Sequence, residues 1–219
     1  MNKEEQILEP LRELYRRDTN HRKLIALYAN NFKSRGVFIR DEVNFLQQRL
    51  AFYKISTDKN LFPVKLLSIE LVPSSCWFSN VRDCVNKQTW DFLRRATYKQ
   101  ANYRCEICGD RGDKWPVECH EIWNYQESNK FQILSGLIAL CPSCHQVKHI
   151  GLAEIQGHGE QAIAHLTRIN GWTAEQTNSY LETVWNIWEQ RSRHSWNLNL
   201  SWLNCYDIHV NNERVKTYR

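Results

Sequence analysis

Apolar residues recur at helical spacing in three segments near the N-terminus, over residues 4–17, 20–32 and 41–55. This period places the apolar side chains on one face of a helix, so three amphipathic helices are predicted. Gly36 follows the second segment, where a residue that ends a helix is expected. The three segments carry no recognisable catalytic pattern. Residues 1–72 are therefore predicted to be a helical scaffold or a region that binds a partner.

Two later stretches alternate between apolar and polar residues, which is the period of a half-buried strand. The first, residues 64–72, lies between Pro63 and Pro73, and the second covers residues 196–202. Residues 72–85 are predicted to form a strand and a turn.

Three more helices are predicted in the second half of the chain, over residues 90–100, 158–169 and 173–193. Thr89 is the expected cap of the first of these helices. Thr173, with Gln176 three residues later, has the pattern of a capping box at the start of the last. Helices thus outnumber strands, and the predicted fold class is α+β, mainly α.

The composition of the 219 residues is that of a folded protein, because 42% are apolar and 24% are charged. No stretch is long and apolar enough to span a membrane, so no membrane partner is expected. The chain begins MNKEEQ, and charges this early are unlike a secretory signal; the expected location is the cytoplasm. The net charge of +5 is compatible with a polyanionic partner but does not identify one.

Eight cysteines are present, and four of them form two Cys-x-x-Cys pairs: Cys105 with Cys108, and Cys141 with Cys144. Two such pairs supply the four thiolates of a structural zinc site, which a cytosolic chain favours over disulfides. The 32 residues between the pairs exceed the usual zinc-finger spacing, so a functional insertion is expected there. The remaining cysteines, including Cys119, are interpreted as small buried residues.

Three histidines accompany the second cysteine pair. His145 and His149 are four residues apart and would lie on one side of a helix that starts at this pair. His120, which lies 25 residues before His145, completes the set if its strand folds back against that helix. Three neutral imidazoles leave coordination positions open, which is the mark of a catalytic metal site. These residues are predicted to hold a catalytic divalent ion.

At these residues the chain resembles the HNH endonuclease superfamily. The matching frame is CEICG (105–109), VECHEI (117–122) and LIALCPSCHQVKH (137–149). The resemblance implies a treble-clef-like ββα-metal core stabilised by zinc, over residues 73–152. The helices and final strand of residues 153–219 are then expected to pack on this core. It also implies hydrolysis of phosphodiester bonds in nucleic acid, as in a bacterial or phage defence-type effector.

Carried over residue by residue, the resemblance gives His120, His145 and His149 as ligands of the catalytic ion. Glu121 stands where the family has its general base, a histidine, and Gly136 stands where it has an asparagine that orients this base. Both are departures from the family pattern. A carboxylate with an ordinary pKa of about 4.3 is ionised at neutral pH and can accept a proton from water.

Glu121, together with His120, is therefore expected to be catalytic. Two alternatives stay open: Glu121 could be a fourth metal ligand, or Glu118 could take one of these roles. The ion could be Mg²⁺, Mn²⁺ or Zn²⁺, since imidazoles favour later transition metals whereas Mg²⁺ prefers oxygen ligands.

Basic residues gather before and within the zinc region, and they are expected to contact phosphates. They are Arg94, Arg95, Lys99, Arg104 and Lys148. No segment resembles a base-reading helix, so DNA is expected to bind with little sequence specificity, and RNA remains an alternative. A non-catalytic zinc module that binds nucleic acid or protein is the competing hypothesis. Residues 1–60 could dock a protein partner or a second copy of the chain.

Overall fold

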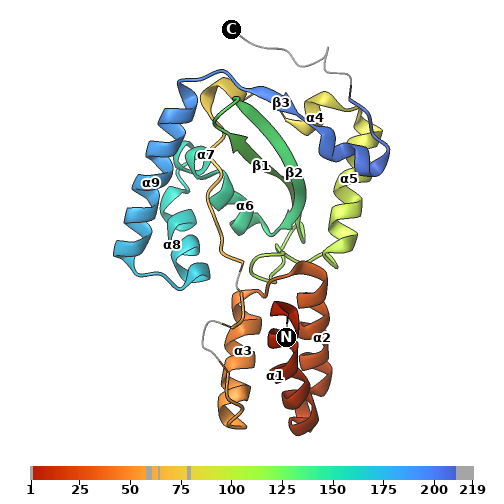
Figure 1. The fold of residues 1–219 in the computed structure, drawn as a ribbon. Coiled ribbons are helices and arrows are strands. Elements are labelled where there is room, and N and C mark those ends of the chain that lie inside the picture. Colours follow the sequence, from red (N-terminus) through yellow and green to blue (C-terminus); the bar gives the residue numbers. More distant parts are fainter. Residues whose placement is uncertain (1, 58–60, 64, 78–79, 211–219) are drawn as a thin grey trace. The chain divides into compact units, whose positions relative to one another are not determined.

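The computed structural model describes residues 2–57, 61–63, 65–77 and 80–210 (Figure 1). These residues divide into two units. The first consists of residues up to Leu66 together with Ile107–Gly109, and the second contains the rest of the described chain. Residues 211–219, which belong to the predicted C-terminal region, lie outside the described residues.

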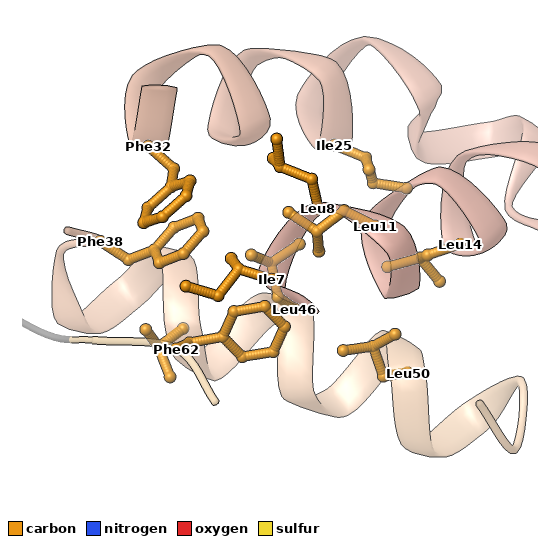
Figure 2. Packing of buried hydrophobic residues seen from close by; sticks show 11 residues of the cluster. Ile7, Leu8, Leu11, Leu14, Ile25, Phe32, Phe38, Leu46, Leu50 and Phe62 are labelled. Atoms are coloured by element: carbon orange, nitrogen blue, oxygen red, sulfur yellow. The ribbon is translucent and has the colours of Figure 1, made fainter. Parts of the chain in front are cut away.

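The first unit is built from helices α1 (Lys3–Arg17), α2 (Arg22–Arg35) and α3 (Arg40–Phe52). The three helices predicted here are confirmed. Their apolar faces meet in one cluster, to which α1 contributes Leu11 and Leu14 and α3 contributes Leu46 and Leu50 (Figure 2). Within this unit Asp18 is fully buried and its carboxylate accepts a hydrogen bond of 2.6 Å from the Arg49 guanidinium. The docking role of this unit stays a prediction.

The second unit holds an antiparallel hairpin of β1 (Glu118–Gln126) and β2 (Phe131–Leu140). Strand β3 (Asn197–Asn199) pairs in parallel with the start of β2. Helix α6 (Pro142–Lys148) follows β2 directly, so the chain runs strand, strand, helix through the predicted metal region. The α+β, mainly α fold class is confirmed.

Short and long helices surround this hairpin. Helices α8 (Gly159–Asn170) and α9 (Ala174–Ser192) lie on one side in Figure 1, and α4 (Val81–Cys84) and α5 (Lys87–Gln100) on the other. Helix α7 (Ile150–Ile155) joins α6 to α8. Thr173 and Gln176 form the predicted capping box of α9. Helix α5, however, is capped by the Asn86 side chain, which accepts a hydrogen bond from the Thr89 N–H, so Thr89 is not the cap.

The strand predicted for residues 64–72 is wrong over its described residues, 65–72, which form no regular element. Side chains take the place of a neighbouring strand. The Asn170 amide accepts a hydrogen bond from the Leu67 N–H at 2.9 Å and donates one to the Leu67 carbonyl at 2.8 Å. The Tyr180 hydroxyl accepts from the Ile69 N–H. An alternating pattern predicts only that every second side chain is buried. Packing against helices can bury these side chains as well as pairing in a sheet can.

Two further strand predictions need correction. Residues 74–76 and 81–84 are short helical turns rather than a strand, and the Asn80 side chain caps the second of them, α4. The alternating stretch 196–202 contributes only the three residues of β3 before a 3₁₀ helix begins at Ser201.

Candidate metal centres

The four cysteines of the two Cys-x-x-Cys pairs come together in a buried cluster. Their sulfur atoms all lie within 4.8 Å of one another. A tetrahedral zinc with Zn–S bonds of about 2.3 Å would keep its sulfurs about 3.8 Å apart, so the cluster fits such an ion. The four residues could thus hold a structural metal: Cys105, Cys108, Cys141 and Cys144.

Local geometry explains how pairs so far apart in sequence meet. The loop of the first pair is joined to β2 by two hydrogen bonds, from the Glu106 N–H to the Ala139 carbonyl and from the Ala139 N–H to the Glu106 carboxylate. Gly109 takes a positive φ of 83° at the turn after this pair, a conformation that glycine adopts without strain. Cys141 caps α6 at the end of β2, so Cys144 falls in its first turn.

The three predicted histidines also meet. His120 lies on β1 opposite Ile138, His145 is inside α6 and His149 is its C-cap. One ring nitrogen of each histidine lies within 4.8 Å of the other two, and the ring centroids are 4.8 to 5.3 Å apart. We refer to these three residues as the His triad. The predicted folding of the His120 strand against the helix is what brings them together.

Two of the imidazoles have a carboxylate beside one of their ring nitrogens. Glu118 lies 2.5 Å from His145 Nδ1, and Glu70 lies 3.1 Å from His120 Nε2. A carboxylate partner fixes the proton on the nitrogen it faces and leaves the other nitrogen bare. Among the described residues, the buried Nδ1 of His120 has no hydrogen-bond partner. An unpartnered nitrogen beside two other imidazoles is the arrangement that a metal ion would satisfy.

The protonation of His145 and His149 agrees with this interpretation. Burial lowers the pKa of His145 and His149, and the nearby imidazole of His120 acts in the same direction. For His149 the pKa falls to about 3. Both rings therefore stay uncharged at neutral pH, and the uncharged imidazole is the form that binds metal. The residues present fit a divalent ion.

Glu70 was not among the residues predicted from the sequence. Burial alone would raise its pKa, but the hydrogen bond to His120 and the charge of Lys148 outweigh burial and hold the pKa below its usual value. Glu70 sits within the alternating segment 65–72, 50 residues before His120, and no motif marks it. A single acidic residue in an alternating, half-buried stretch is the one signal that could have pointed to it.

Lys148 does not lie where a phosphate-binding residue is needed. Its side chain is only 6% exposed, and its ammonium donates to Glu70 Oε1 at 3.0 Å and to Ser68 Oγ at 2.9 Å. This pairing disfavours the predicted contact of Lys148 with nucleic acid, which stays a prediction. A buried ammonium that has two partners offers no charge to a phosphate outside.

Glu121 follows His120 on β1, so its side chain points to the opposite face of the strand. Its Oε1 accepts a hydrogen bond of 3.2 Å from the Val81 N–H at the start of α4. Burial raises the pKa of Glu121 and the charge of Asp83 adds to the rise, while His120 and the Val81 N–H oppose it. The carboxylate does not join the atoms of the His triad that lie within 4.8 Å of one another. This placement disfavours Glu121 as a metal ligand.

The other predicted nucleic-acid contacts belong to α5 and the loop that follows it. Arg95, Lys99 and Arg104 are exposed. Arg94 is partly buried, and its guanidinium donates to the Asp91 carboxylate at 2.7 Å. Arg95, Lys99 and Arg104 thus lie at the surface, and Arg94 forms an ion pair with Asp91.

Comparison with protein-family models, with curated proteins and with solved structures gives no match. Within the described residues, no helix has the length and apolar character needed to cross a membrane.

Proposed function

We propose that the protein is a metal-dependent nuclease that hydrolyses phosphodiester bonds, with DNA as the first candidate substrate. The observation that carries the proposal is the His triad, in which the carboxylates of Glu70 and Glu118 face one ring nitrogen of two imidazoles and leave the other bare. A purely structural site would close its coordination shell, as the four cysteines do. The sequence resemblance to HNH endonucleases supports the same assignment.

Each group then has a separate task. His120, His145 and His149 would hold a divalent ion, which when bound supplies the positive charge that a developing phosphorane needs. The family resemblance, rather than the position of its side chain, assigns Glu121 as the group that would accept a proton from the attacking water. The Oε1 of Glu121 is held by the Val81 N–H, which orients the carboxylate. In the family, an asparagine orients the imidazole base. This chain has Gly136 at the position of that asparagine, and the Val81 N–H would orient the Glu121 carboxylate instead.

Burial suits Glu121 to this task. Burial raises the pKa of the Glu121 carboxyl, and a carboxylate with a raised pKa is a stronger base than an exposed one. Arg95, Lys99 and Arg104 would attract the phosphate backbone without reading bases. The proposed activity is therefore expected to weaken steeply as salt concentration rises.

The test is cleavage of supercoiled plasmid, linear duplex, single-stranded DNA and RNA by protein freed of loosely bound divalent ions, with metal analysis showing that the cysteine cluster keeps its metal. Mg²⁺, Mn²⁺ or Zn²⁺ is added back, or EDTA is kept in excess. Cleavage that needs a divalent ion and stops with EDTA is the expected result. Binding of nucleic acid without cleavage under every metal would contradict the proposal and favour the non-catalytic zinc module.

Exchanging Glu121 for glutamine is expected to slow cleavage by about 10²–10⁴-fold, the usual effect of a lost acid–base group. The amide oxygen can still accept from the Val81 N–H, so the fold should be unchanged. Metal affinity, measured by calorimetry, should stay at the wild-type value while single-turnover cleavage falls. Weak metal binding that excess Mn²⁺ rescues would instead make Glu121 a ligand. Wild-type rates would remove Glu121 from the reaction and direct attention to Glu118.

A further inference from the structure

A fifth side chain touches the cysteine cluster. His165, on α8, places its Nε2 3.2 Å from the sulfur of Cys144, which is fully buried in the first turn of α6. Its nitrogen thus reaches a sulfur that belongs to the cluster, although His165 is not one of the four residues whose ligand atoms all lie within 4.8 Å of one another. His165 is therefore a neighbour of the metal site and not one of its four ligands.

A second contact fixes which nitrogen of His165 carries the proton. The guanidinium of Arg168 lies 3.1 Å from His165 Nδ1, one turn further along α8. A guanidinium can only donate, so Nδ1 must be the acceptor and is unprotonated. In the neutral ring the proton is then on Nε2, which faces the sulfur. The contact is an N–H···S hydrogen bond with the imidazole as donor.

This donor has a clear electrostatic use. Four thiolates around one divalent ion leave a net charge of about −2 in a buried place, and buried charge is costly unless hydrogen bonds or opposite charge offset it. A donor on one thiolate withdraws part of that charge. The same withdrawal makes the sulfur less nucleophilic and a poorer target for oxidants.

We propose that His165 is a positioning residue of the structural metal site, which donates to the Cys144 thiolate and thereby slows metal loss and thiol oxidation. Arg168 sets the tautomer that makes this possible. The site is thus completed by α8, which lies beyond the motif that supplies the ligands. The proposal concerns the structural metal alone and does not depend on nuclease activity.

The test compares two substitutions of His165 in the full, zinc-loaded chain. His165→Phe keeps a ring in place but has no donor, whereas His165→Gln keeps an N–H that can reach the sulfur. Zinc transfer to a chromogenic chelator is expected to be about 10–100-fold faster for the phenylalanine variant, the usual effect of losing a group that supports a metal ligand. The glutamine variant should stay within a few-fold of wild type.

The matched control is His158→Ala, an exposed histidine that precedes α8 on the same chain segment, and it should release zinc at the wild-type rate. Alkylation of the released thiols should follow the same order as zinc transfer. Nitrogen NMR of the loaded protein should show His165 protonated on Nε2. A wild-type rate for the phenylalanine variant, an equally fast loss from the glutamine variant, or a proton on Nδ1 would each overturn the proposal.

Discussion

Replacing His149 by alanine is expected to abolish metal-dependent cleavage while the zinc of the cysteine cluster is retained. His149 is one of three imidazoles whose nitrogens meet, and its lowered pKa of about 3 keeps it ready to bind metal. Without it, two ligands remain, and the ion is held weakly. If charge neutralisation contributes about 4 kcal/mol to the transition state, the rate falls about 10³-fold.

The matched control for this variant is His194→Ala, which removes an exposed imidazole outside the triad and should leave cleavage unchanged. Circular dichroism and zinc content must be those of the wild type, so that a loss of activity is a loss of the site and not of the fold. A folded His149→Ala protein that cleaves at near wild-type rates with every metal would refute the assignment of the triad.

Replacing Cys144 by serine is expected to release the structural metal and to unfold the second unit. The apparent binding free energy of a structural zinc is on the order of 10–16 kcal/mol, which matches or exceeds the whole stability of a typical domain. Cys144 is fully buried between α6 and α8, where a serine hydroxyl is a poor ligand and a costly polar group.

Metal analysis and thermal unfolding check this expectation. The variant should contain less than one zinc per chain and lose its cooperative transition, or melt far below wild type. The interpretation of Cys205 as a small buried residue is wrong, because its side chain is exposed; Cys205→Ser is therefore the control and should be silent in both measurements. Wild-type zinc content and stability of the Cys144 variant would show that the cluster is not a metal site.

Much of this structure could be predicted from local sequence patterns. Residues 4–17 become α1 almost residue for residue, and the capping box at Thr173 fixes the start of α9. The two Cys-x-x-Cys pairs and the spacing of His145 and His149 are likewise local, since each pair needs only one turn of chain. Patterns of this kind work because their geometry is set within a few residues.

Features that depend on distant partners were not predictable in the same way. The segment around Leu67 alternates like a strand, but the backbone groups of Leu67 and Ile69 pair with side chains more than 100 residues away. Glu70 reaches His120 only because that segment is held in place. The position of Lys148 in the zinc region predicts a phosphate contact. The sequence does not show that the Lys148 ammonium is paired with Ser68 and Glu70.

The hydrogen bonds that fix Leu67 affect whether the two metal centres can be transferred to another protein in a short fragment. A fragment cut to residues 103–152 would carry every cysteine and histidine of both centres. It would lack Glu70, together with Asn170 and Tyr180, the residues that hold the segment containing it. Grafted onto another scaffold, such a cassette would leave His120 free to rotate and to exchange its proton between both nitrogens. In the whole chain, substitution of Asn170 in α8 or Tyr180 in α9 is therefore expected to change the tautomer of His120 through Glu70.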